Sequence, residues 1–116
     1  MNYIQGKVWG NTEPLFCKNN VEMHRIEVVS GHYCSKHCHE YKHNMLYVES
    51  GKLKITVWKN DYDLVDETFV SSGQSTVVPP KEYHFFEAME DTIAYEIYWV
   101  ELNKKDILRE NHGGKS

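Results

Sequence analysis

Three histidines are spaced in a way that suits a metal ion. His37 and His39 lie two residues apart. In an extended strand this spacing points both imidazoles to the same face. His84 lies far along the chain, and it joins the pair if its strand neighbours the first. Three neutral imidazoles form a known ligand set for catalytic metals, because water or substrate takes the remaining positions.

Alternating side chains indicate that β-strands position these histidines. Residues 53–57 alternate apolar and polar side chains, and residues 21–29 and 93–99 show a similar period of two. That period is typical of a strand with one buried face. Turn-forming residues separate the runs, at 50–51, 60–61, 71–73 and 79–82. Short, evenly spaced strands in a chain of 116 residues predict a single β-sandwich or barrel domain.

Two groups of residues recur with fixed spacing around the histidines. They are Gly31, His37, His39 and Gly51, and then Gly73, Pro79 and His84. Their joint spacing resembles the paired motifs of the cupin superfamily over nearly the whole chain. The resemblance implies an all-β, cupin-type jelly-roll barrel in residues 1–102, followed by a short C-terminal helix or tail in residues 103–116. It also implies one divalent metal ion inside the barrel mouth: zinc, iron, manganese or nickel.

The fourth metal ligand is open. The family's metal-binding glutamate falls at Asn44, whose amide oxygen is a weaker ligand for a hard cation than a carboxylate. His43 is an alternative that would give an all-nitrogen set, and Glu40 ranks behind both. The second motif also departs from the family, with Lys81 in place of its glycine and Ala88 in place of its asparagine.

A narrower resemblance concerns residues 73–84 and 106–113. These segments are similar to the C-terminal cupin domain of type II mannose-6-phosphate isomerases, although His112 stands where an aromatic residue is usual. The resemblance implies a metal-dependent sugar-phosphate isomerase or epimerase-like enzyme. In such an enzyme the metal polarises the substrate oxygens and a nearby base moves a proton.

Candidate bases and substrate-binding residues surround the predicted metal site. The base is expected to be Glu96 or His43, since a carboxylate facing into a barrel must be paired or lie near a metal. The substrate pocket is expected to be lined by Tyr47, Tyr98, Phe86 and Arg109. Arg109 and Lys115 are the candidates for binding a phosphate, because cationic side chains bind phosphate through charge-assisted hydrogen bonds.

The cysteines do not suggest a disulfide framework. Three cysteines, Cys17, Cys34 and Cys38, fit a reducing compartment, which predicts a cytoplasmic location. Cys38 lies between His37 and His39 and therefore points to the opposite face. We expect Cys38 to be a buried apolar residue and Cys34 a loop residue.

Composition limits the partners. The net charge of −4 comes without a basic patch, which argues against nucleic acid, and no apolar run of about 18 residues predicts a membrane span. The cupin resemblance implies a small-molecule ligand and a homodimer. Two other functions stay open: a three-histidine non-haem iron oxygenase, and a non-enzymatic module that binds metal or carbohydrate.

Overall fold

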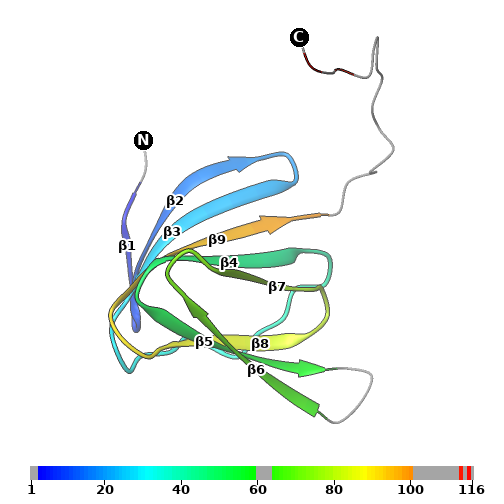
Figure 1. Ribbon diagram of the computed structural model, residues 1–116. Coiled ribbons are helices and arrows are strands. Elements are labelled where there is room, and N and C mark those ends of the chain that lie inside the picture. The colour runs from blue at the N-terminus through cyan, green and yellow to red at the C-terminus, as the bar shows by residue number, and fades with distance from the viewer. Residues whose placement is uncertain (1–2, 60–63, 101–112, 114, 116) are drawn as a thin grey trace.

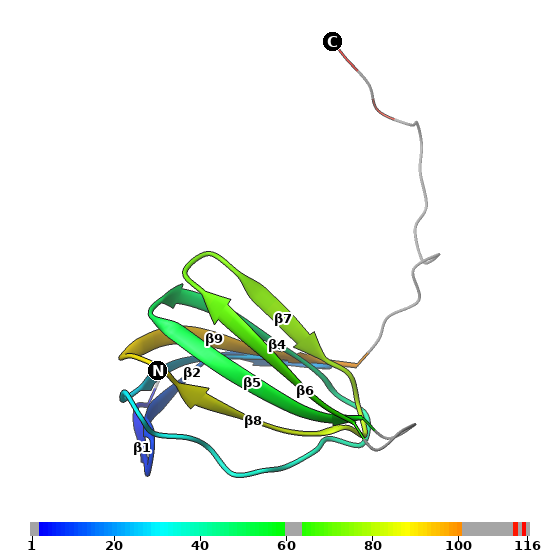
Figure 2. The same cartoon turned by 60° about the horizontal axis from the view of Figure 1, so that its bottom comes forward.

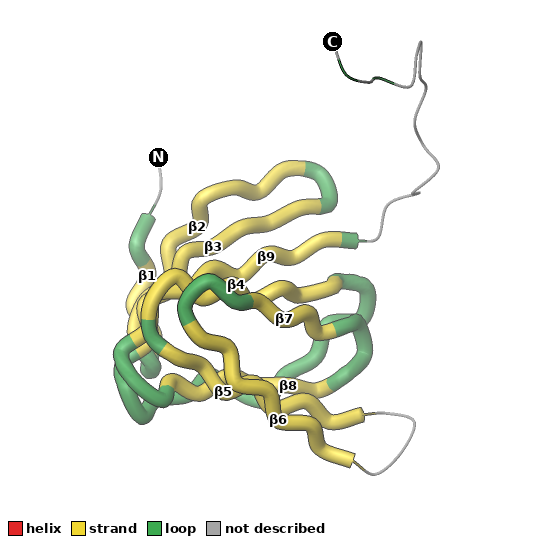
Figure 3. The backbone as a smooth tube through the Cα atoms, viewed as in Figure 1, coloured by secondary structure: helices red, strands yellow, loops and turns green. Residues whose placement is uncertain are grey.

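The structure is a computed structural model that describes residues 3–59, 64–100, 113 and 115. This part of the chain contains strands and turns but no helix (Figure 3). The strands are β1 (Gln5–Lys7), β2 (Gly10–Lys18), β3 (Val21–Val28), β4 (His43–Ser50), β5 (Lys52–Lys59), β6 (Leu64–Ser71), β7 (Ser75–Val78), β8 (Tyr83–Ala88) and β9 (Thr92–Trp99). The predicted all-β class is confirmed.

The strands form two antiparallel sheets. The larger sheet has the order β1-β2-β3-β9-β4-β7, and the smaller one has the order β6-β5-β8. The smaller sheet lies across from the larger one, with the chain crossing between them several times (Figure 1). A view turned by 60° shows the same two layers, with β1 at one end of the larger sheet (Figure 2). This arrangement encloses the core between the two sheets.

Alternation along the strands decides what the core contains. The predicted inner set of β5, Leu53, Ile55 and Val57, is buried, with no more than 8% of any side chain exposed. In β9 the inner set is instead Thr92, Ala94 and Glu96. Thr92 and Ala94 are small and fit beneath the sheet. The larger residues that alternate with them therefore lie on the outer face of the sheet, and these are Ile93, Tyr95, Ile97 and Trp99. Their hydrophobicity alone would not predict this orientation.

The segment between β3 and β4 carries the first two histidines. We expected His37 and His39 on a strand, but this segment is extended without being a regular strand. It pairs with β8 only at isolated bridges, Tyr33 with Glu87 and His37 with His84. These bridges attach the segment to the edge of the smaller sheet.

Several predictions fall outside the described residues. They are the hairpin tip at 60–61 and, apart from Gly113 and Lys115, the C-terminal helix or tail at 103–116. The described strands on either side, β5 and β6, pair antiparallel, with Lys59 opposite Leu64. Within the described part of the chain, no helix is long and apolar enough to cross a membrane.

Candidate metal centre

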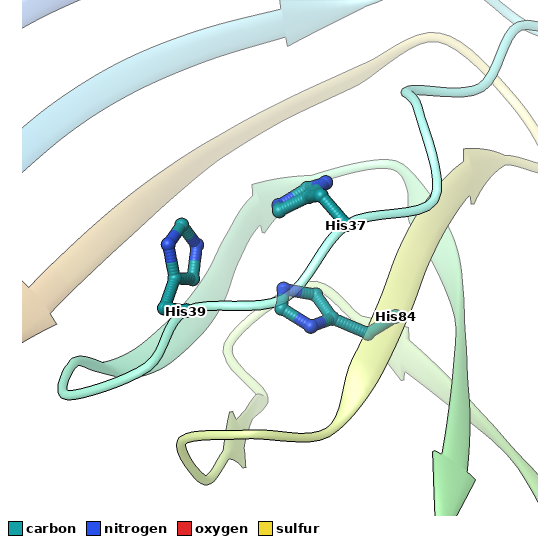
Figure 4. A group of neighbouring side chains, drawn as sticks. All are labelled: His37, His39 and His84. Carbon is teal, nitrogen blue, oxygen red and sulfur yellow. The ribbon is translucent and has the colours of Figure 1, made fainter.

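Backbone pairing brings the three histidines together. His37 and His84 exchange two backbone hydrogen bonds, of 3.0 and 2.8 Å, although they lie far apart in sequence. His39 follows two residues later in the same extended segment. The backbone N–H of Lys81 donates to the carbonyl of His39 at 2.6 Å, which attaches this segment to the turn before β8. The three imidazoles consequently gather around one space (Figure 4).

The three rings are close enough to share an ion. Ring centroids are 4.5 Å apart for His37 and His84, 5.1 Å for His37 and His39, and 5.7 Å for His39 and His84. One ligand atom from each ring lies within 4.8 Å of the others. Zinc–nitrogen bonds are about 2.0–2.1 Å, so small ring rotations would bring all three nitrogens onto one ion.

Backbone carbonyls orient two of the rings. The Nδ1 of His37 lies 2.7 Å from the Ser35 carbonyl oxygen, and the Nδ1 of His84 lies 3.0 Å from that of Glu82. A carbonyl only accepts, so each Nδ1 carries the proton and each Nε2 keeps its lone pair. Metal-binding histidines use this arrangement to fix both the tautomer and the ring orientation.

Burial keeps two of the three imidazoles neutral. It lowers the pKa of His39 to about 4, with the neighbouring His37 and His84 adding to the effect. Burial also lowers the pKa of His84. At neutral pH both imidazoles are therefore uncharged, which is the form that binds a metal.

Two buried polar atoms beside the cluster lack a hydrogen bond among the described residues. They are the Nε2 of His39 and the Oδ1 of Asn44. A buried polar atom without a hydrogen bond lowers the stability of the fold by about 1–3 kcal/mol, so a bound partner such as a metal ion would stabilise the site. Asn44 is 1% exposed, and its Nδ2 lies 3.4 Å from the Nε2 of His84. An imidazole lone pair and an amide oxygen are both donors that suit a divalent cation.

The other candidate ligands lie elsewhere. His43 precedes Asn44 in β4, so its side chain is on the opposite face of the strand. It stacks on Trp99 with ring centroids 5.3 Å apart. Glu40 is exposed. The structure thus brings Asn44 to the three histidines, and it does not bring His43 or Glu40 there.

A carboxyl group shares the interior with the histidines. Glu96 is 8% exposed and accepts a hydrogen bond from the Tyr98 hydroxyl. Burial raises the pKa of Glu96, against hydrogen bonds from Tyr98 and Asn44 that lower it. Burial also raises the pKa of Tyr98, so its hydroxyl stays a donor.

His37, Glu96 and Tyr98 line a cavity of about 290 Å³. Its lining residues are Gln5, Lys7, Trp9, Thr12, Pro14, His24, Cys34, Ser35, His37, Phe86, Glu96 and Tyr98. The set includes three of the predicted pocket or base residues, namely Phe86, Glu96 and Tyr98. Tyr47 is 40% exposed on the outer face of β4, beside Tyr95, and Arg109 lies outside the described residues.

Comparison with known proteins identifies the family. The family model described as Cupin domain matches residues 24–101, which is more than half of the chain. The chain belongs to the cupin family. No curated protein sequence matches it. The narrower resemblance to type II mannose-6-phosphate isomerases stays a prediction.

Solved structures resemble this cupin in fold. KdgF from Halomonas sp. has a TM-score of 0.73 at 16% identity, over 87% of this chain and 88% of that one. Oxalate decarboxylase from Bacillus subtilis, a protein with Mn(II) centres, has a TM-score of 0.78 at 13% identity. The match covers 85% of this cupin but 27% of the decarboxylase chain. CapF from Staphylococcus aureus, a capsular polysaccharide assembling protein, has a TM-score of 0.73 at 20% identity, over 91% and 30% of the two chains.

His24 is a cavity residue of this cupin that the sequence did not single out. It pairs with Glu96 across β3 and β9, and its ring lies 6.0 Å from that of Tyr98. The signal was present in the alternation of residues 24–28, because His24 shares a face with Ile26 and Val28, both buried.

The burial of the two cysteines near the site differs from the expectation. Cys34 is the buried one, 7% exposed, and its Sγ accepts a hydrogen bond from the Phe86 backbone N–H at 3.3 Å. Cys38 is partly exposed. The reason is the course of the extended segment between β3 and β4. It runs alongside β8, and Cys34 lies over the core there. The prediction that Cys38 is buried is wrong. Cys34 does lie in a loop, as predicted, but at a buried position of it.

The burial of Cys34 predicts which thiols react with an alkylating reagent. Burial raises the pKa of Cys34 to about 12, so its thiol stays protonated and unreactive at pH 8. We expect iodoacetamide to label Cys17 and Cys38 in the native protein and Cys34 after addition of urea. Peptide mass spectrometry measures this directly. Labelling of native Cys34 as fast as Cys17 would contradict its burial.

Proposed function

We propose that this cupin is a metal-dependent isomerase or epimerase-like enzyme acting on a small sugar phosphate or related compound. The observation that carries the proposal is a buried carboxyl, Glu96, in the same cavity as His37 of the histidine cluster. A metal site paired with a group of raised pKa is suited to moving a proton next to a carbonyl. The Mn(II) centres of oxalate decarboxylase support a divalent metal in this fold.

His37, His39 and His84 would hold the ion, with Asn44 as the fourth ligand. A divalent ion of zinc, iron, manganese or nickel held there supplies Lewis-acid polarisation of the substrate's carbonyl and hydroxyl oxygens. The proton transfer itself is carried out by side chains of the protein.

Glu96 is the proposed base. Its raised pKa lets the carboxylate accept a proton from the carbon beside the carbonyl and return it to the neighbouring carbon. The Tyr98 hydroxyl orients the carboxylate through its hydrogen bond. The apolar ring of Phe86, 4% exposed, helps to exclude water from this part of the cavity. His43, the other base that the sequence suggested, stacks on Trp99 outside the cavity and has no such role here.

Proton exchange in deuterium oxide tests the proposal. Protein loaded separately with Zn²⁺, Mn²⁺, Fe²⁺ or Ni²⁺ is incubated with mannose 6-phosphate or fructose 6-phosphate and followed by NMR. We expect deuterium at C2 of the aldose and conversion between the two sugars. Glu96→Gln should lower the rate about 10²- to 10⁴-fold, since it removes the base, while the metal content is unchanged.

Glu87→Gln is the matched control for that substitution. Glu87 lies on the outer face of β8, with its carboxylate 3.4 Å from the ammonium of Lys54. Its loss should leave the exchange rate within twofold of the wild type. Full activity in Glu96→Gln would reject Glu96 as the base, and no exchange with any of the four metals would reject the isomerase.

A three-histidine iron oxygenase is the second candidate. The observation that favours it is the all-neutral donor set, in which Asn44 replaces the family's carboxylate. Iron-dependent oxygen consumption with a thiol or diketone substrate, without sugar-phosphate exchange, would support this activity. Metal binding without either reaction would support a non-enzymatic module that binds metal or carbohydrate.

The proposal extends to assembly and location. An exposed sheet edge favours pairing with a second chain, and β6 is an edge strand with six of its eight residues exposed. We propose a homodimer on this ground. The three free cysteines support the reducing environment of a cytoplasmic protein.

A further inference from the structure

The cavity has a second polar end, away from the histidines. Gln5 and Lys7 of β1 and Thr12 of β2 line the same cavity of about 290 Å³ as His37 and Glu96. β1 lies at one edge of the larger sheet (Figures 1 and 2), and β9 is three strands away in the order β1-β2-β3-β9. The cavity therefore extends from His37 and Glu96 toward this edge.

Strand register shows that these side chains face inward. Gln5 pairs with Thr12, which pairs with Ile26 of β3. Ile26 is fully buried, so the residues directly opposite it share the interior face of the sheet. Lys7 lies two residues after Gln5 and consequently projects from the same face as Gln5.

These three side chains have unused hydrogen-bond donors. Within residues 3–59 and 64–100, no hydrogen bond or ion pair involves the side chain of Gln5, Lys7 or Thr12. Other lysines of the chain do pair with acids: Lys42 lies 2.9 Å from Glu22 and Lys54 lies 3.4 Å from Glu87.

The charges along the cavity are ordered. Lys7 is the one lysine or arginine among the described lining residues, and Glu96, at the β9 side, is the one acid. An ammonium group with neutral donors beside it is suited to an oxyanion, because charge-assisted hydrogen bonds are the strong ones. The distance from β1 to β9 is about 14 Å between backbones, at about 4.8 Å per strand. Side chains entering from both ends shorten this gap to the length of a small molecule.

We propose that the β1 end of the cavity binds the anionic group of the substrate, a phosphate or a carboxylate, through Lys7 with Gln5 and Thr12. The reacting oxygens of the same molecule then face His37 and Glu96. This inference deepens the proposed function, because it assigns the anion to Lys7 rather than to the C-terminal Arg109. The anion site itself does not depend on which reaction follows.

Calorimetric titration of the full chain tests the site by binding rather than by turnover. The probes are mannose 6-phosphate, gluconate and uncharged mannose, each titrated into metal-loaded and metal-free protein. We expect at least one of the two anionic probes to bind at least tenfold more tightly than mannose. The anionic probe that binds more tightly shows whether the site prefers a phosphate or a carboxylate. Lys7→Gln should weaken the anionic probe about 10- to 100-fold and leave mannose within twofold, since it removes one charge-assisted contact.

Lys18→Gln and Arg109→Gln are the comparison variants. Lys18 is exposed at the far end of β2 and lines no part of the cavity, so its loss should change no affinity. Raising the salt concentration should weaken anion binding in the wild type more than in Lys7→Gln. Salt screens the attraction between Lys7 and the anion, and the variant lacks that attraction. Circular dichroism checks that Lys7→Gln is folded, which its exposed edge position favours.

The outcomes separate this inference from the proposed function. Equal affinity for anionic and neutral probes, or an anion affinity that depends on Arg109 and not on Lys7, overturns the β1 anion site. Binding of the anion through Lys7 without deuterium exchange keeps the site and rejects the isomerase. Exchange that proceeds equally well on uncharged mannose, with no effect of Lys7→Gln, keeps the isomerase and overturns the site.

Discussion

Replacing His84 with alanine is expected to reduce metal binding from about one ion per chain to a level near zero. His84 supplies one of three imidazoles and is also the partner of Asn44 across the site. Loss of an outer-shell partner alone lowers metal affinity about 10- to 100-fold, so loss of a ligand should exceed that range. Equilibrium dialysis against Zn²⁺ and Mn²⁺, with elemental analysis of the protein, measures the change.

Two further variants make the result interpretable. His84 is 3% exposed, so His37→Ala, at a more accessible position of the same cluster, shows the same loss if folding of the first variant is impaired. His43→Ala is the control, because His43 lies on the other face of β4 against Trp99. It should keep its metal. A metal that survives the loss of both His37 and His84 would mean that the cluster does not bind it.

Replacing Gly51 with alanine is expected to be the most destabilising single methyl addition among the motif glycines. Gly51 turns the chain between β4 and β5 with a φ of 95°, a conformation that residues with a side chain rarely adopt. A Cβ there would overlap the Asp91 carbonyl oxygen and lie 2.7 Å from the Thr92 Cα. Backbone strain of about 1–3 kcal/mol and overpacking of a similar size should add, giving a loss of about 2–6 kcal/mol.

Gly73→Ala is the matched comparison. Gly73 has a similar φ of 81°, but a Cβ there would have no atom within 4 Å. Only the conformational penalty applies, and we expect a loss of about 1–2 kcal/mol. Urea unfolding followed by tryptophan fluorescence gives both values. Equal losses would show that the contact with β9 does not decide the cost at Gly51.

The two glycines also explain part of the family spacing in physical terms. Both hold a positive φ at a turn, and the turns set where the neighbouring strands start. The corresponding glycine of the second motif is absent, since Lys81 occupies that position with a φ of 70°. The turn before β8 therefore keeps its shape without glycine, tied to the metal-site segment through the hydrogen bond to His39.

Other positions could not be predicted from spacing. Adjacent residues His43 and Asn44 were both candidates for the fourth ligand, and only the pairing of β4 with β7 and β9 shows which of them faces inward. His24 reaches the cavity because β3 pairs with β9, a contact between segments far apart in sequence. Lys7 reaches it because β2 and β1 continue the same sheet beyond β3.

The sequence by itself determined the all-β fold class, the positions of the turns between the described strands, and His37, His39 and His84 as the candidate metal ligands. These depend on short-range periodicity and on motif spacing, both of which can be recognised in the sequence without knowing how the strands pack. The tertiary structure alone decided which face of β9 is buried, and with it that Glu96 lies inside. Both faces of residues 92–99 carry apolar groups, so local hydrophobicity does not distinguish them. The packing of the two sheets makes this choice: Thr92, Ala94 and the hydrogen-bonded Glu96 are buried on the face of β9 that the smaller sheet covers.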